Sequence, residues 1–172
     1  MAKGKVVDTW KTKSWYSVLA PEMFESREIA QIPSSEESHL INRIMRVSLA
    51  DLTGDMSQVY TTLNFRIKEI KGKTAFTKLI GHELLAGYLK ALVRRRRDVI
   101  NEVVDVQTKD NTPLKIKMTL FTAKKVSSKI KTAIRNNSKE EVKERAKEMD
   151  FPHLEQEIIF GKFSTRIFNR VK

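Results

Sequence analysis

The chain has 172 residues, a length that suits one medium-sized domain with an appendage, and 40% of them are hydrophobic, which excludes global disorder. It has no cysteine, which excludes disulfides, thiolate metal sites and a cysteine nucleophile. Lys and Arg outnumber Asp and Glu by 33 to 21, and a net charge of +12 in a folded chain points to a polyanionic partner, nucleic acid first.

Residues 1–14 are predicted to form a basic N-terminal arm that becomes ordered on a phosphate backbone. A β-rich domain is expected over residues 15–123, and it begins with a strand at WYSVL (15–19). Residues 25–40 are polar and contain Pro33, which predicts a weak edge strand followed by a loop.

Apolar and polar side chains alternate along residues 43–49 and 60–70, a period of two that predicts half-buried strands. In the second segment Leu63, Phe65 and Ile67 are expected to face inward. The sequence KGK then turns the chain, and TAFTKLI continues as a third strand.

From His82 the apolar period becomes that of a helix, which is expected to bury a face that ends at Leu92. This face consists of Leu84, Leu85, Tyr88, Leu89 and Leu92. The helix runs into four consecutive arginines, Arg94 to Arg97, at a helix end that favours cations. Since successive side chains diverge, we expect two or three of them to contact RNA phosphates and at least one to pair with Asp98 or the helix-end carbonyls.

A β-hairpin is predicted from DVINEVVDVQT, the turn KDNTP and LKIKMTLFT. In its second strand, Lys115 and Lys117 alternate with apolar side chains and are expected to face outward. Together these elements predict an α+β fold with a mainly antiparallel, barrel-like β body, one inserted helix and a C-terminal helical extension.

That basic helical extension is expected over residues 124–172; residues 123–172 hold 13 basic and 7 acidic groups, net +6 of the total of +12. NNS at 136–138 predicts a helix break, after which Ser138 and Glu141 match a capping box. The last helix, after Gly161, has an apolar face and, beside it, a basic stripe. The face consists of Phe163, Ile167, Phe168 and Val171, and the stripe of Lys162, Arg166 and Arg170.

Catalytic motifs are not found. HELLA (82–86) carries Ala86 where a zincin motif needs its second histidine, and DLTGD (51–55) meets Thr62 where a calcium loop needs glutamate. We therefore expect no enzyme activity, no metal, no cofactor and no small-molecule substrate. An enzyme of nucleic-acid metabolism that uses Asp51, Asp55 and Glu83 is the weaker alternative.

No apolar run is long enough for a membrane span or a secretory signal, so a cytoplasmic protein is expected. Trp15 or Tyr16 could stack on a base, although core packing is the favoured interpretation. Charge placement selects the candidate RNA contacts, with an ordinary solvated basic face as the alternative. These contacts are Lys3, Lys5, Lys11, Lys13, Arg94, Arg95, Arg96, Arg97, Lys115, Lys117, Lys124, Lys125, Lys162, Arg166 and Arg170.

The stretch KVVDTWKTKSWYSVLAPEMFESREIAQ (5–31) resembles the opening of the archaeal and eukaryotic eS1 (S3Ae) family of small-subunit ribosomal proteins. It carries the W-Y-x-V-x-A-P-x-M-F pattern from Trp15 to Phe24, and the resemblance continues at VSLADLTGD (47–55), at VDVQTKDNTPLKIKMTLFTAKK (104–125) and into the helical tail. Members of that family usually continue past the position of Lys172 into a basic segment with a Tyr-Pro-Leu motif, which this sequence does not contain.

The resemblance implies a structural, non-catalytic constituent of the small ribosomal subunit in the cytoplasm. It implies small-subunit ribosomal RNA as partner, near the platform and messenger exit, together with neighbouring ribosomal proteins and, as a further candidate, messenger RNA. The alternative that the residues leave open is a free-standing RNA-binding or RNA-chaperone module outside the ribosome.

Overall fold

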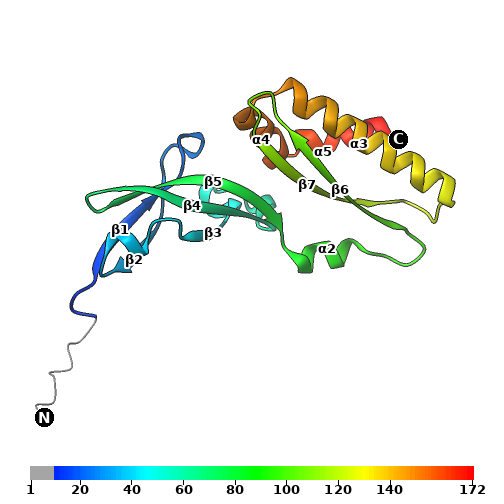
Figure 1. The fold of residues 1–172 in the computed structure, drawn as a ribbon. Helices are drawn as coiled ribbons and strands as arrows, with labels where there is room; N and C mark the ends of the chain where they lie inside the picture. The colour runs from blue at the N-terminus through cyan, green and yellow to red at the C-terminus, as the bar shows by residue number, and fades with distance from the viewer. Residues whose placement is uncertain (1–9) are drawn as a thin grey trace, which may run out of the picture. The chain divides into compact units, whose positions relative to one another are not determined.

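The computed structural model describes residues 10–172, which divide between Leu89 and Lys90 into two compact units (Figure 1). The first unit carries a five-stranded sheet, and the second carries a two-stranded hairpin with three helices. This division differs from the predicted boundary at residues 123/124, because the hairpin of residues 99–121 shares one core with the C-terminal helices. The fold is α+β, as predicted.

The sheet of the first unit has the strand order β2-β1-β5-β4-β3. Its strands are β1 (Ser14–Leu19), β2 (Glu28–Ser34), β3 (Ile44–Ser48), β4 (Thr61–Lys71) and β5 (Thr74–Leu84). Neighbours pair antiparallel except β1 and β5, which run parallel. Pro33 lies in the edge strand β2, as predicted. Proline has no backbone N–H to donate to a neighbouring strand, so it is tolerated at the edge of a sheet. β2 and β3 are both edges of this sheet, and barrel closure stays a prediction.

One face of this sheet holds the core of the first unit. Leu63, Phe65 and Ile67 are fully buried, which confirms the alternation predicted for β4. Phe24, from the short 3₁₀ helix η1 (Glu22–Phe24), packs edge-on against Phe65 with ring centroids 5.9 Å apart. In β1, Tyr16 is buried but Trp15 is 59% exposed, so core packing is wrong for Trp15.

Short helical segments connect these strands. α1 (Leu49–Thr53) begins at Ser48, whose side chain accepts a hydrogen bond from the Ala50 amide, and ends at Gly54, whose φ of 78° favours glycine. Two further 3₁₀ turns are η2 (Glu37–His39) and η3 (Met56–Gln58). α1 contributes Leu49, Ala50 and Leu52 to the core.

The helix predicted from His82 begins later and is less buried than expected. Residues 82–84 belong to β5, where they pair with residues 61–63 of β4, and α2 spans only Ala86–Leu92. None of its residues is buried. The helix start predicted at His82 is therefore wrong, because residues 82–84 pair with β4 as part of strand β5.

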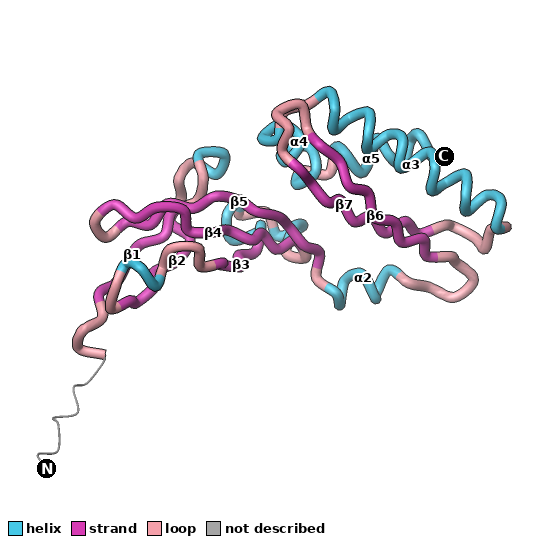
Figure 2. Tube along the Cα trace, in the orientation of Figure 1, coloured by secondary structure: helices cyan, strands magenta, loops and turns pink. Residues whose placement is uncertain are grey.

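The second unit is a hairpin covered on one face by helices (Figure 2). β6 (Val99–Gln107) and β7 (Pro113–Phe121) pair antiparallel, as predicted. The helices are α3 (Ser128–Glu148), α4 (Phe151–Ile159) and α5 (Lys162–Val171). Their core includes Val104, Val106, Met118, Val142, Ala146, Leu154, Phe163 and Ile167. Phe168 is 64% exposed and does not join this core, which corrects the predicted apolar face of the last helix.

The break predicted at residues 136–138 is absent, because α3 continues through them. Ser138 is fully buried, and its hydroxyl donates to the carbonyl oxygens of Ile134 (2.8 Å) and Arg135 (3.0 Å). A serine that bonds to the preceding turn is compatible with a helix interior. The capping-box prediction is wrong for this reason, and Glu141 bonds instead to Arg170.

Candidate nucleic-acid interface

The open end of the hairpin is fixed by Asp98 and Thr122. The Thr122 amide donates to the Asp98 carbonyl (3.0 Å), and the Asp98 amide donates to the Thr122 hydroxyl (2.9 Å). The Asp98 carboxylate accepts from the Val126 amide (2.8 Å) and pairs with Lys131 of α3 (2.9 Å). The Val126 and Lys131 contacts hold the pKa of Asp98 below its ordinary value. The segments on both sides of the hairpin are thereby held next to each other.

Arg94 to Arg97 occupy the loop before this end, and all four are exposed. Arg96 adopts a φ of 62°, a left-handed conformation that lets the loop turn. Among residues 10–172 no carboxylate pairs with any of the four, and Asp98 is engaged by Lys131. At least one of the four was expected to pair with Asp98 or with the helix-end carbonyls, and among residues 10–172 neither pairing is found.

Lys124 and Lys125 lie in the loop after the same hairpin end, and both are exposed. Lys125 is close enough to Asp98 to contribute to lowering the pKa of Asp98. We call Arg94, Arg95, Arg96, Arg97, Lys124 and Lys125 the hairpin-base cluster. Two predicted groups of residues, far apart in sequence, thus lie at the same end of one hairpin.

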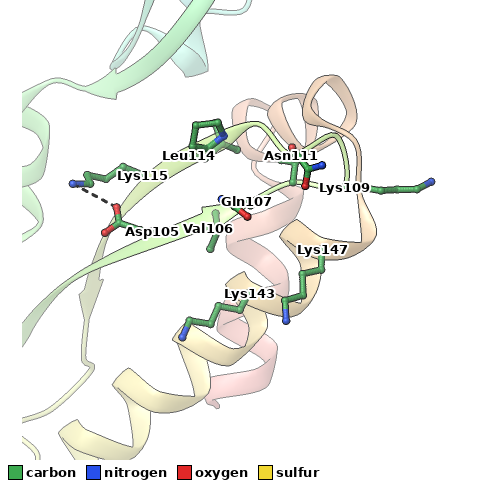
Figure 3. Close-up of a pocket in the computed structure, with 11 residues that line it drawn as sticks. Asp105, Val106, Gln107, Lys109, Asn111, Leu114, Lys115, Lys143 and Lys147 are labelled. Carbon is green, nitrogen blue, oxygen red and sulfur yellow. Dashed lines mark ion pairs between the residues drawn. The ribbon is translucent and has the colours of Figure 1, made fainter.

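A concave surface of about 1020 Å³ lies between α3 and the turn of the hairpin (Figure 3). We call it the lysine groove, because Lys109, Lys115, Lys143 and Lys147 line it. Figure 3 shows Lys143 and Lys147 projecting from α3, while Lys115 pairs with Asp105 across the two strands at 3.4 Å. Asp105 is the only carboxylate in the lining, so the groove favours an anion.

The groove extends the sequence-based prediction, which selected only Lys115 from its lining. Lys143 and Lys147 stand four residues apart, one turn of α3, and that spacing was a usable signal. Lys109 lies in the turn and pairs with Asp150 at 3.9 Å. Its position in the groove depends on the packing of α3 against the hairpin, which the sequence does not show.

The first unit supplies a second basic face that the candidate set omitted. Arg66 of β4 lies in register with Lys78 of β5. Arg46 of β3 lies in register with Asn64 of β4, two residues before Arg66. All three cations are exposed on the face opposite the core. Such cross-strand rows place cations where successive phosphates can meet them.

Other predicted contacts are distributed over the chain. Lys117 is exposed opposite Val103, Lys11 is exposed, and the Lys13 ammonium lies 4.1 Å from the centre of the Trp10 ring. Lys3 and Lys5 fall outside the described residues.

The predicted basic stripe of α5 is largely engaged with carboxylates. Arg170 bonds to Glu141 (2.8 Å) and Glu144 (2.6 Å), and it also lies 3.6 Å from Glu140. Arg166 lies 3.7 Å from Glu157, while Lys162 is exposed. The arginines of this stripe hold the helices together, and an RNA contact by Arg170 would compete with three carboxylates.

Two of the three carboxylates considered for catalysis, Asp55 and Glu83, have local structural partners. Asp55 accepts a hydrogen bond from the Ser57 amide (2.9 Å), which keeps its pKa low, and Glu83 accepts one from Asn64 (3.0 Å). Within residues 10–172 no group of three or more metal-ligating side chains was found. Over the same residues, no helix is long and apolar enough to cross a membrane.

These features define a basic, two-unit α+β protein whose cations gather at one hairpin end, in a groove and on a sheet face. The sequence profile of the Ribosomal S3Ae family matches residues 1–172. Small ribosomal subunit protein eS1 of Saccharolobus islandicus (strain L.S.2.15 / Lassen #1) is 38% identical over 169 residues, 98% of this chain and 81% of the relative.

Small ribosomal subunit protein eS1 of Methanococcus vannielii is 36% identical over 173 residues, which cover 99% of this chain and 79% of that protein. The chain therefore belongs to the Ribosomal S3Ae family, a family of structural, non-enzymatic ribosomal proteins. The resemblance drawn from residues 5–31 is confirmed.

Proposed function

We propose that this chain is a structural constituent of the small subunit of the cytoplasmic ribosome and binds small-subunit ribosomal RNA through phosphate contacts. The observation that carries the proposal is the hairpin-base cluster. It presents six exposed cations beside a single carboxylate, Asp98, which α3 already occupies. Charges that have no carboxylate partner among residues 10–172 are available to phosphates, and each contact adds a salt-dependent increment to affinity.

The position within the subunit is a finer proposal. The family resemblance supports a place near the platform and messenger exit, beside neighbouring ribosomal proteins, with messenger RNA as a further candidate partner. The rigid parts of both units fix the geometry of the cations, which position a protein on RNA without reading its sequence.

The hairpin-base cluster is proposed as the main contact, and the lysine groove and the basic sheet face are proposed as additional ones. Lys3, Lys5, Lys11, Lys13, Lys117 and Lys162 stay candidates on charge alone. Arg166 and Arg170 are placed last, because their guanidiniums are already paired.

Equal removal of charge at two places tests the site. One variant carries Arg94→Gln, Arg95→Gln and Arg97→Gln, and the control carries Lys68→Gln, Lys71→Gln and Lys73→Gln, so both lose three cations. Binding to small-subunit ribosomal RNA is measured from 50 to 300 mM salt. The slope of log affinity against log salt should become shallower by about 2 in the first variant, at about 0.7 to 0.9 per lost phosphate contact.

The control should change the slope by less than half as much. Equal slopes for both triple variants would show that net charge matters and that the cluster does not. Sucrose-gradient sedimentation of cells that make the protein tests the ribosomal role separately. A protein that co-sediments with small subunits supports the proposal, and one confined to the light fractions favours the free-standing RNA-binding module.

A further inference from the structure

Trp15 of β1 lies on the basic sheet face with its indole largely open to solvent. Side chains alternate along the strand, so Tyr16 and Val18 point into the core while Trp15 points to the opposite face. The indole is 59% exposed, although tryptophan is among the largest apolar groups that a fold can bury. Because β2 and β5 pair with β1 on its two sides, this exposure is fixed by the sheet itself.

The flat faces of the Trp15 ring are open to a ligand. Trp10, the other tryptophan, has the Lys13 ammonium 4.1 Å from its ring centre. Phe76, which shares the sheet face, has the Lys71 ammonium 5.3 Å from its own ring centre. Among residues 10–172 neither a stacked ring nor a cation is found against Trp15. An open aromatic face is the surface on which an unpaired RNA base stacks.

Two hydroxyl groups occupy the next row of the same face. Ser17 follows Trp15 by two residues, and the register of β1 with β5 places it opposite Thr74. Neither hydroxyl has a hydrogen-bond partner within the described part of the chain, residues 10–172. Hydroxyls beside a stacking ring can bond to the polar edge of a base, which is open in an unpaired nucleotide and occupied by pairing in a duplex.

The charges of this face favour an RNA strand. Lys71 lies in register with Thr74, which places a cation in the row next to Trp15. Further along the face stand Arg46, Arg66 and Lys78. The carboxylates beside these cations already have partners among their neighbours, and they are Glu28, Glu69 and Glu83. The face therefore keeps a positive balance that suits phosphates.

A nucleotide matches all three kinds of group on this face. The open ring accepts a base, the hydroxyls meet its polar edge, and the cations meet the phosphates on either side. An apolar protein segment would cover the hydroxyls and cations without giving them partners, which costs free energy. The combination therefore selects RNA as the occupant.

We propose that an unpaired nucleotide of small-subunit ribosomal RNA binds the basic sheet face with its base stacked on Trp15. Its polar edge faces Ser17 and Thr74, and the phosphates of the same strand face Arg66 and Lys78. Phosphate contacts alone accept duplex and single-stranded RNA alike, so the stack makes this face selective for an unpaired segment. This inference rests on the proposed binding to ribosomal RNA.

Two substitutions of Trp15 separate the aromatic ring from its bulk. Trp15→Leu exchanges one exposed apolar side chain for another and removes the ring, whereas Trp15→Phe keeps a ring. Binding to small-subunit ribosomal RNA is measured from 50 to 300 mM salt. Trp15→Leu should weaken binding about tenfold at every salt concentration, and Trp15→Phe about twofold. The slope of log affinity against log salt should stay unchanged, because stacking releases no counterions.

The matched control is Trp10→Leu, which removes the other exposed indole and should change the affinity less than twofold. Equal losses for the two leucine variants, or an unchanged affinity for Trp15→Leu, would overturn the inference. Salt-dependent binding of the wild type would leave the proposed function standing in either case. If the wild type does not bind ribosomal RNA, the proposed function fails first.

Abasic RNA tests the stack from the side of the ligand. Short single strands that tile the small-subunit ribosomal RNA serve as probes, and the best binder is remade with one base removed at each position in turn. One such removal should weaken the wild type about tenfold and leave Trp15→Leu unaffected, because the partner ring is already absent. If both proteins respond alike at every position, no base stacks on Trp15.

Photo-crosslinking in the assembled subunit tests the class of occupant. Trp15 is replaced by p-benzoylphenylalanine in the full chain, small subunits are purified and irradiated, and adducts are identified by mass spectrometry. The expected adduct is to an unpaired nucleotide of ribosomal RNA. Adducts to another protein, adducts to base-paired RNA only, or an absence of adducts would each overturn the inference.

Discussion

Asp98 and Lys131 form an ion pair of 2.9 Å that fastens the base of the hairpin to the first turns of α3. The two side chains are only 18% and 29% exposed, so solvent screens this pair less than an ordinary surface pair. The pair leaves the neighbouring arginines without a carboxylate partner in the described chain. Structural anchoring and RNA binding are therefore divided between adjacent residues.

The pKa of Asp98 predicts acid sensitivity at this anchor. Hydrogen bonds from Val126 and Lys131 lower its folded pKa below 3.8. A carboxyl group with a lowered folded pKa stabilises the fold above its unfolded pKa, and that stabilisation is lost as the pH falls through the folded value. We expect the loss below about pH 4, the ordinary range of an aspartate.

The measurement is urea unfolding of the wild type and Asp98→Asn at pH 6 and pH 3. Asparagine keeps an oxygen for the Val126 amide but loses the charge that pairs with Lys131. The variant should be less stable at pH 6, and its free energy of unfolding should change less between the two pH values. An identical pH dependence in both proteins would show that Asp98 does not contribute.

Arg170 provides a test of structural against RNA-binding roles. Its guanidinium bonds to Glu141 and Glu144, which dock α5 on α3. Arg170→Gln should lower the melting temperature, while the slope of RNA affinity against salt should stay within about 0.3 of the wild type, because a lost phosphate contact changes it by about 0.7 to 0.9. Arg95→Gln should leave the melting temperature unchanged and make the salt slope shallower. A large slope change for Arg170→Gln would show that Arg170 contacts RNA.

Local sequence predicted the elements whose pattern is short-ranged. The alternation of Leu63, Phe65 and Ile67 and the hairpin of residues 99–121 were correct, because inward and outward faces of a strand are set two residues apart. The helix start at His82 was wrong because residues 82–84 pair with residues 61–63, a contact that local periodicity does not contain.

The candidate site could likewise be predicted only where neighbouring residues in the sequence decide it. The exposure of Arg94 to Arg97 could be predicted, since four adjacent charges cannot all be buried. The engagement of Arg170 could not be predicted, because its carboxylates lie 26 and 29 positions away on α3. Lys143 was missed for a related reason, since only the packing of α3 on the hairpin creates the groove.

The lysine groove predicts a second, separable part of RNA affinity. Lys143→Gln with Lys147→Gln should reduce the salt slope by about 1.5, from two contacts at about 0.7 to 0.9 each. Arginine at both positions keeps the charge and should preserve the slope. If the glutamine variant binds RNA like the wild type, the groove does not contact RNA under these conditions.

The separate cores predict that the two units lose structure independently. Leu154 is fully buried in the core of the second unit, and Leu63 of β4 is fully buried on the core face of the first sheet. Leu154→Ala leaves a cavity and should destabilise its own unit by about 2 to 5 kcal/mol. Hydrogen exchange read by mass spectrometry should then rise in α3, α4 and α5 while β4 keeps its protection.

Leu63→Ala is the matched change, since it removes the same atoms from an equally buried site in the other unit. It should raise exchange in β4 and β5 and leave α3 protected. If either variant exposes both units together, the chain unfolds as one cooperative body. In that case damage to one core would abolish all three proposed RNA-binding surfaces. Independent units would preserve the hairpin-base cluster and its salt-dependent RNA binding in Leu63→Ala.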